Sequence, residues 1–265
     1  MSASSYIADC PASVSLRGAP FEVKCSLLAA EEDTRIVGDG VTMRRLRTQL
    51  QRLGPHFRTA LISGEGGTGK ELVARELHRL SPHADGPFVV FNAASVENAV
   101  IEWRGAAEAL PTGADDLDSL LRAAHGGTLF FDRISELPIA MQAQLLEVLE
   151  RKEFAGRSSR SMEHGETRII ASTSEDLRVL ASAGRFRKDL YFKISAVEIA
   201  LPPLRERMED VPALVAYFSL RCAEITGRSG GGLTDAASNR LLRHAWPGNV
   251  LELKSLVCMI SMKRG

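Results

Sequence analysis

One stretch decides the fold of this chain: Leu61-Ile62-Ser63-Gly64-Glu65-Gly66-Gly67-Thr68-Gly69-Lys70-Glu71. Its four glycines keep side chains out of a loop, so that backbone N–H groups can converge on phosphate oxygens, and Lys70 adds a positive charge for the β- and γ-phosphates. A β-type run precedes the loop and a helix-forming run follows it, at Thr59–Ser63 and Lys70–Leu80, which is the context that a phosphate loop requires. We therefore predict a nucleotide-binding loop built from Gly64, Glu65, Gly66, Gly67, Thr68, Gly69, Lys70 and Glu71.

Strand and helix patterns alternate on both sides of this loop. Strands are expected at Thr59–Ser63, Pro87–Asn92, Gly127–Asp132, Arg168–Thr173 and Ala196–Leu201. Helical spacing of apolar residues occurs around Met43, Leu46, Leu50 and Leu53, over Lys70–Leu80, over Ile139–Glu150 and from about Glu175. This alternation indicates an α/β fold, a parallel sheet flanked by helices on both faces.

After Pro202-Pro203 the pattern contains helices only. They are expected at Val211–Thr226, Asp235–Ala245 and Val250–Lys263, with a flexible joint at Gly227–Gly232. The sequence thus predicts three parts: an N-terminal extension or linker (1–34), an α/β nucleotide-binding core (35–205) and a small C-terminal helical lid (206–265).

The composition narrows the class of protein. Lys plus Arg and Asp plus Glu both number 33, so there is no basic excess to indicate nucleic-acid binding. No apolar run approaches the roughly 18 residues that a membrane helix needs, and residues 1–15 lack a secretory signal pattern. Cys10, Cys25, Cys222 and Cys258 have no metal-ligand spacing, and we expect four separate thiols. These features favour a cytoplasmic protein that contacts no membrane.

A second motif supports nucleotide binding. Gly126-Gly127-Thr128-Leu129-Phe130-Phe131-Asp132 is an apolar strand that ends in an acid. In ATPases with a phosphate loop, such an acid holds Mg²⁺ through water opposite the loop. Asp132 is therefore the candidate metal residue, with ATP or ADP and Mg²⁺ as the expected cofactors.

These two motifs and three others resemble the AAA+ domain of the bacterial sigma-54-dependent transcription activators. The similar segments are Gly64–Glu71, Gly126–Pro138, Gly184–Tyr191, Leu201–Arg207 and Trp246–Val250, within a match from about Ile36 to the C-terminus. The resemblance explains Glu71, which stands where other phosphate loops carry a Mg²⁺-binding Ser or Thr. It implies a P-loop AAA+ core with a helical lid, and self-association into rings with nucleotide at the subunit interfaces.

The position after Asp132 departs from the family pattern. The resemblance implies a glutamate that polarises the attacking water, restrained by a residue that corresponds to Asn92, but this chain has Arg133. A cation cannot act as this base, and losing a placed acid–base group typically slows catalysis about 10²–10⁴-fold. Glu136 is close in sequence, but the turn after the strand is expected to point it elsewhere.

Other positions that the resemblance assigns to hydrolysis also differ. Arg187 corresponds to one arginine finger, whereas the second finger position is Lys193, which keeps the charge and loses the bidentate fork. In the sensor strand Thr173 matches, while Ser174 replaces the usual asparagine. The sensor arginine of the lid is replaced by Leu251, which plain packing on an apolar helix face would also explain.

The loop that the family uses to contact sigma-54 is altered as well. An ungapped alignment from Glu102 places Leu110, Pro111, Thr112 and Gly113 in this loop. Pro111 stands where the family has the phenylalanine that contacts the sigma factor. Proline offers no aromatic face and stiffens the loop, so sigma-54 contact is doubtful.

The sequence therefore favours a nucleotide-binding AAA+ domain that regulates transcription through assembly, alone or in mixed rings with a related activator, with hydrolysis and sigma-54 remodelling impaired. Direct DNA binding is not expected, because the sequence stops at Gly265 where the lid ends. Two alternatives stay open. One is an active ATPase that remodels sigma-54 RNA polymerase; the other is a module that senses another nucleotide, such as a cyclic dinucleotide.

Overall fold

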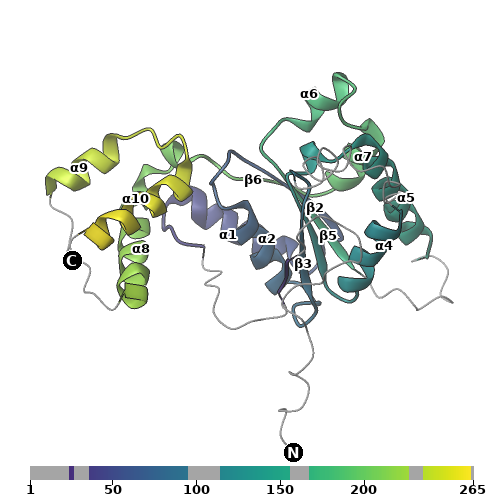
Figure 1. Ribbon diagram of the computed structural model, residues 1–265, viewed down its shortest axis with the longest axis horizontal. Coiled ribbons are helices and arrows are strands. Elements are labelled where there is room, and N and C mark those ends of the chain that lie inside the picture. The colour runs from purple at the N-terminus through teal and green to yellow at the C-terminus, as the bar shows by residue number, and fades with distance from the viewer. Residues whose placement is uncertain (1–23, 27–35, 95–113, 156–166, 227–234, 264–265) are drawn as a thin grey trace, which may run out of the picture.

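The computed structural model describes residues 24–26, 36–94, 114–155, 167–226 and 235–263, and its centre is a six-stranded sheet in the order β1-β3-β4-β5-β2-β6 (Figure 1). The last five strands of this order are parallel to one another, whereas β1 pairs antiparallel with β3. The strands are β1 (Lys24–Ser26), β2 (Thr59–Ser63), β3 (Phe88–Asn92), β4 (Thr128–Asp132), β5 (Arg168–Thr173) and β6 (Glu198–Ala200). The five predicted strands and the α/β class are confirmed.

Helices cover both faces of the sheet. One face carries α1 (Val41–Leu53) and α2 (Lys70–Arg79), and the other carries α4 (Ala114–Ala123), α5 (Ile139–Ala155), α6 (Leu177–Ser182) and α7 (Lys188–Ile194). Every residue of β5 is buried, as is all of β4 except its terminal Asp132. Strands covered on both faces read as continuous apolar runs, which is why the sequence predicts β4 and β5 well.

The structure corrects three predictions in this core. β1 lies inside the stretch expected to be an extension or linker, and three residues are too few to show a strand period. α4 lies in a region where no helix was predicted, although its Leu117 and Leu120 are buried. The single helix expected from Glu175 is two helices, α6 and α7, because the chain turns at Gly184 with a φ of +72°.

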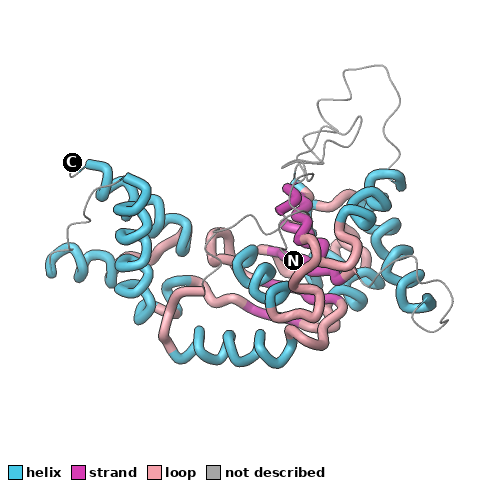
Figure 2. The backbone as a smooth tube through the Cα atoms, turned by 90° about the horizontal axis from the view of Figure 1, so that it is seen from below, coloured by secondary structure: helices cyan, strands magenta, loops and turns pink. Residues whose placement is uncertain are grey.

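The predicted helical lid is confirmed as α8 (Val211–Thr226), α9 (Asp235–Arg243) and α10 (Asn249–Lys263). These helices lie at the opposite end of the molecule from α4 and α5 (Figures 1 and 2). The lid has its own buried cluster of Leu204, Val211, Leu214, Val215, Trp246, Leu253 and Val257. The joint predicted at Gly227–Gly232 lies outside the described residues.

Cys222 of α8 and Cys258 of α10 are joined by a disulfide, with their Cα atoms 5.9 Å apart. The prediction of four separate thiols is wrong for this pair. The two residues are 36 positions apart, so sequence spacing alone could not show that two packed helices bring them together. Within the described residues, no helix combines the length and apolar character needed to cross a membrane.

Candidate functional site

The predicted phosphate loop, Asp132 and Thr173 gather at the edge of the sheet where the parallel strands end, whereas Lys193 lies at the opposite edge, beside Thr59 at the start of β2. β5 lies between β2 and β4, so the loop after β2, the end of β5 and the end of β4 are neighbours. In open α/β sheets, ligands bind outside the carboxyl ends of the strands. The fold therefore brings the phosphate loop, Thr173 and Asp132 to one place.

The phosphate loop has the geometry of an anion cradle. Gly64, Gly67 and Gly69 have φ angles of +154°, +75° and +102°, which side-chain-bearing residues rarely adopt. A Cβ added at Gly66 would meet no atom within 4 Å, so the loop is open at this point. Within the described residues, the backbone N–H groups of Gly66, Gly67 and Gly69 donate to no protein acceptor. Such N–H groups at a helix N-terminus fit phosphate oxygens.

Lys70 lies inside this loop at the first residue of α2. Its Nζ donates to the carbonyl oxygens of Gly64, at 2.7 Å, and Glu65, at 2.9 Å. Burial lowers the pKa of Lys70 below its ordinary value, while the Asp132 carboxylate opposes this shift and the Arg133 guanidinium adds to it. Lys70 therefore lies within the fields of both an acid and a second cation.

Asp132 ends β4 and is held by a buried serine. Ser172 Oγ donates to Asp132 Oδ1 at 2.5 Å and accepts the backbone N–H of Arg133 at 3.2 Å. Arg133 adopts the left-handed backbone conformation, with a φ of +57°. The chain therefore turns sharply away from the strand at the residue after Asp132, and the Arg133 side chain is 56% exposed.

Glu136 and Asn92 flank this turn. Glu136 Oε1 lies 3.6 Å from Arg133 Nη1, so Glu136 faces the cation three residues before it. Asn92 pairs in register with Asp132, and its Oδ1 accepts the backbone N–H of Ala94 at 3.1 Å. Asn92 therefore lies beside Asp132 at the ends of the two strands, and the Glu136 carboxylate lies beside the Arg133 guanidinium.

Of the two acids near the phosphate loop, Asp132 is the one that could hold Mg²⁺, because the Glu71 carboxylate is already engaged by Arg75. Glu71 accepts hydrogen bonds from Arg75 Nη2 at 2.8 Å and Nε at 3.1 Å, on the exposed side of α2. Within the described residues, no group of three or more His, Cys, Asp or Glu side chains could hold a metal ion. A Mg²⁺ ion would therefore be shared between Asp132 and the phosphates of a nucleotide, to which it supplies charge neutralisation.

The two residues predicted as fingers, Arg187 and Lys193, lie at the two ends of α7. Arg187 is the N-cap residue, and its guanidinium donates to Asp189 at 2.7 and 3.1 Å, which lowers the pKa of that carboxyl. The backbone N–H of Arg187 donates to Oε1 of the buried Gln142, which ties the finger segment to α5. Lys193 is in the last turn, where its carbonyl accepts the Thr59 hydroxyl. The Arg187 side chain is 39% exposed, so part of its guanidinium faces solvent.

Thr173 connects the sensor strand to the phosphate loop. Its carbonyl accepts the backbone N–H of Gly64 at 3.1 Å. Its hydroxyl both donates to the carbonyl and accepts the N–H of Glu175, and this closes the turn after β5. Ser174, in that turn, is exposed.

The lid, and Arg205 at the junction that leads into it, contact the phosphate loop directly. Glu65 accepts two hydrogen bonds from Arg205, at 2.6 and 2.9 Å, and one from Asn249 Nδ2 at 3.2 Å. Asn249 Nδ2 also donates to the Gly66 carbonyl, and its Oδ1 accepts the N–H of Leu204. The Gly67 carbonyl accepts the backbone N–H of Val250 at the start of α10. The position of the lid and the shape of the loop are therefore coupled.

Leu251 is next to this contact and does not pack in the lid. It is 61% exposed, whereas Leu253 on the same helix is fully buried. A Cβ added at Gly67 would lie 3.0 Å from the Leu251 Cβ, and the Leu251 N–H faces the Gly67 carbonyl at 3.3 Å. The interpretation of Leu251 as plain lid packing is therefore wrong, because the side chain lies beside the phosphate loop.

The Glu65 contact predicts a pH dependence of stability. Hydrogen bonds from Arg205, and then from Asn249, lower the pKa of Glu65 from 4.5 to about 2. Because the folded-state pKa is the lower one, the contact stabilises the folded chain fully above pH 4.5 and is lost as the pH falls to about 2. The Tm advantage of the native chain over a Glu65→Gln variant should therefore shrink across this range in calorimetry. A Glu224→Gln control, which loses an exposed pair with Arg221, should show a smaller effect, and equal behaviour of the two variants would refute the coupling.

Four residues of the site were not singled out as functional from the sequence. Ser172 contacts Asp132, Arg205 and Asn249 hold Glu65, and Gln142 holds Arg187. A fifth, the buried Arg207, donates to the Thr68 carbonyl at 3.0 Å. Three of these residues could have been found from the sequence, because they lie within the family motifs quoted above: Arg205, Arg207 and Asn249. No sequence motif marks Ser172 or Gln142.

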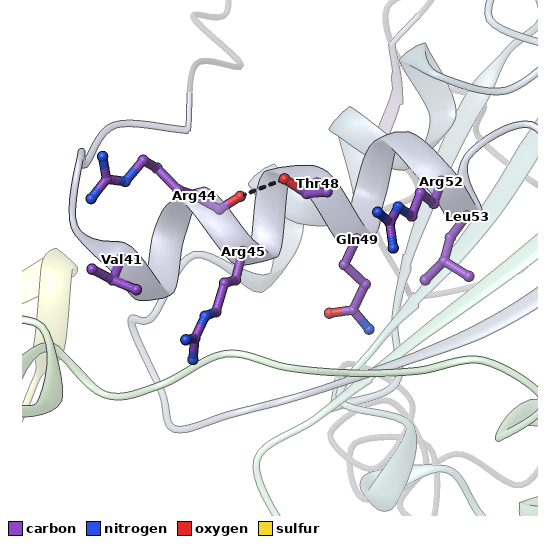
Figure 3. A pocket seen from close by; sticks show the side chains of 7 residues that line it. All are labelled: Val41, Arg44, Arg45, Thr48, Gln49, Arg52 and Leu53. Atoms are coloured by element: carbon purple, nitrogen blue, oxygen red, sulfur yellow. Dashed lines mark hydrogen bonds between the residues drawn. The ribbon is translucent and has the colours of Figure 1, made fainter.

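One predicted feature cannot be placed, and one hollow lies apart from the phosphate loop. Leu110, Pro111, Thr112 and Gly113, predicted as a remnant of the sigma-contact loop, lie outside the described residues. A hollow of about 570 Å³ runs along the exposed face of α1 (Figure 3) and is lined by Val41, Arg44, Arg45, Thr48, Gln49, Arg52 and Leu53. It includes no residue of the phosphate loop, so it is separate from the nucleotide site.

Comparison with known proteins agrees with this geometry. The sigma-54 interaction domain matches residues 36–200, and the AAA+ ATPase lid domain matches residues 205–263. The response regulator PilR of Pseudomonas aeruginosa is 38% identical over 86% of this chain and 52% of its own length. The transcriptional regulator NtrC of Azospirillum brasilense is 41% identical over 86% of this chain and 48% of its own length.

The structure of NtrX from Brucella abortus in complex with ATP covers 88% of this chain and 53% of that protein, with a TM-score of 0.70 and 33% identity. The ADP complex gives a TM-score of 0.72. The chain spans about half the length of the curated relatives it matches. It belongs to the sigma-54 interaction domain family, the AAA+ ATPase domains of bacterial transcription activators.

Proposed function

We propose that this chain binds ATP or ADP between its phosphate loop and its lid, and that it regulates transcription with its ATP hydrolysis and sigma-54 remodelling weakened. The units proposed for this are the core (35–205) and the lid (206–265), in a cytoplasmic protein. Nucleotide binding is supported by the open glycine loop, by Lys70 inside it and by the lid contacts of Glu65. It is also supported by the ATP and ADP complexes of the relative NtrX.

The observation that carries the weakened hydrolysis is the residue after Asp132. Arg133 places an exposed guanidinium there, and its partner Glu136 lies 3.6 Å away. A general base must lie within hydrogen-bond reach of the water it activates and must be able to accept its proton. A guanidinium cannot accept this proton, because it is already protonated at neutral pH. The nucleotide should therefore be bound more readily than it is hydrolysed.

The lid supports the same proposal. A sensor residue that couples nucleotide to lid position needs a cation beside the phosphates. Leu251 lies beside Gly67 with a largely exposed apolar side chain, so it offers no charge there. The lid instead contacts the loop through Asn249, which donates to Glu65, the residue that Arg205 also holds from the junction between core and lid. We propose that lid position in this chain responds to the loop itself more than to a γ-phosphate.

Assembly is the proposed route to regulation. Arg187 is accessible at the end of α7 and is available in trans to nucleotide on a neighbouring subunit, in rings of this chain or in mixed rings with a related activator. Lys193 has the charge but lacks the planar fork that grips phosphate in two places. Pro111, in place of an aromatic residue, weakens the case for sigma-54 contact.

A thermal-shift panel of nucleotides tests the binding proposal. ATP and ADP at about 100 times Kd should raise the Tm by roughly 5–10 °C, because a ligand that binds only the folded state adds about 2.7 kcal/mol at this ratio. A cyclic dinucleotide should give no shift. A shift with the cyclic dinucleotide and none with ATP or ADP would replace the proposal with a sensor of another nucleotide.

A further inference from the structure

Ser172 is a buried hydroxyl in an otherwise apolar strand segment. Its neighbours on β5, Ile169, Ile170 and Ala171, are at most 1% exposed, and Ser172 itself is fully buried. Burying a hydroxyl is unfavourable unless the hydroxyl forms hydrogen bonds. The strand register explains where these bonds go, because Ala171 pairs with Phe131 and the next residues, Ser172 and Asp132, are therefore neighbours.

The Ser172 hydroxyl serves two consecutive residues. It donates to Asp132 Oδ1 at 2.5 Å and accepts the Arg133 N–H at 3.2 Å. Arg133 is the first residue after β4, and its partly buried N–H finds an acceptor in the Ser172 side chain on the adjacent strand. One side chain thus fixes both the carboxylate rotamer of Asp132 and the turn that begins at Arg133.

This contact determines which carboxylate oxygen can face a metal-bound water. A hydrogen bond from Ser172 engages Oδ1 and leaves Oδ2 outside this contact. Hydrogen bonds to charged acceptors are stronger than those between neutral groups, so the rotamer of Asp132 is held firmly. A carboxylate held in this way loses less side-chain freedom when it engages Mg²⁺.

We infer that Ser172 is a positioning residue for the Mg²⁺–nucleotide complex, acting through the Asp132 carboxylate. This inference rests on the proposed nucleotide binding. Ser172 touches neither nucleotide nor metal; it sets the oxygen that Asp132 presents. Its removal should therefore weaken the part of nucleotide affinity that depends on Mg²⁺ and leave the remainder unchanged.

The test is a titration of a fluorescent ATP analogue into the chain, once in Mg²⁺ and once in EDTA. The native chain should bind more tightly in Mg²⁺, and Ser172→Ala should reduce this gain about tenfold, the effect of one hydrogen bond to a charged group. The affinity in EDTA should not change. Ser172→Thr, which keeps the hydroxyl, should retain the gain.

Two further variants make the result specific. Ser81→Ala is the matched control, because it also removes a buried serine hydroxyl that accepts a backbone N–H, that of His83, at 3.1 Å. It should leave the Mg²⁺ gain unchanged. In an Asp132→Asn background, Ser172→Ala should add no further loss of the gain, since its effect passes through the carboxylate.

Three outcomes would overturn the inference. An undiminished Mg²⁺ gain in Ser172→Ala would refute it and leave nucleotide binding intact. An equal loss in Mg²⁺ and in EDTA would show a structural role only. A native chain that binds nucleotide in neither condition would overturn the proposed function, and the inference with it.

Discussion

Replacing Arg133 with glutamate is expected to raise the steady-state rate of ATP hydrolysis by about 10²–10⁴-fold, the typical contribution of a positioned general base. The substitution puts a carboxylate directly after Asp132, at the turn that Ser172 already supports. Both arginine and glutamate must adopt the left-handed conformation there, so the backbone cost is the same in both chains. Phosphate release from ATP, measured at concentrations that favour oligomers, reports the gain.

Two control variants separate the new base from the lost cation. Arg133→Gln removes the positive charge near Lys70 without adding a base, and it should remain as slow as the native chain. Glu136→Gln in the Arg133→Glu background should keep the gained activity, because Glu136 is not the proposed base. An equal gain in Arg133→Gln would contradict the account. It would show that the positive charge of Arg133, and not the missing base, slows hydrolysis in the native chain.

Replacing Lys70 with alanine is expected to weaken ATP and ADP binding about 10- to 100-fold, the range of one or two hydrogen bonds to a charged group. The variant loses the positive charge of the cradle and the two bonds from Nζ to the Gly64 and Glu65 carbonyls. Isothermal titration calorimetry with each nucleotide measures the effect.

Lys254→Ala is the matched control for this change, since Lys254 is an exposed lysine on α10. Its nucleotide affinity should equal that of the native chain. Native affinity in Lys70→Ala, with circular dichroism that shows an intact fold, would remove the phosphate loop from the binding site.

Local sequence patterns carried most of the fold. The phosphate loop is predictable because its glycines and Lys70 lie together in one short segment, and the central strand β4 because burial on both faces makes it a nearly unbroken apolar run. The three lid helices follow from helical spacing. Two elements were not predicted because their local patterns are weak. β1 has only three residues, and α4 lies in a region rich in alanine and acidic residues, where few apolar positions mark its buried face.

The parts of the site that depend on distant contacts could not be predicted. Glu65 and Asn249 are 184 positions apart, and Glu65 and Arg205 are 140 apart, so their contact appears only when the lid folds onto the loop. Ser172 acts on Asp132 through the register of two adjacent strands. The position of Leu251 was not predictable for a similar reason. The apolar pattern of α10 indicates packing within the lid, but in the folded chain the start of this helix lies against the loop and holds Leu251 beside Gly67.

The proposed function separates the residues for phosphate binding from the residues for ATP hydrolysis. Lys70, the glycine loop and Asp132 with Ser172 form a connected set at the carboxyl ends of the strands. Arg133, by contrast, occupies the position that the family resemblance assigns to the general base, and the residue of the lid beside the loop is the apolar Leu251. A chain of this kind can respond to nucleotide by changing its assembly, since binding and association are linked.

The most direct measurement compares ATP binding and steady-state ATP hydrolysis in one sample of the native chain, at concentrations that force oligomers and with Lys70→Ala as the background. The account predicts saturable ATP binding with no phosphate release above that background. Sustained turnover by the native chain would contradict it and would identify an ATP-driven activator that uses another acid.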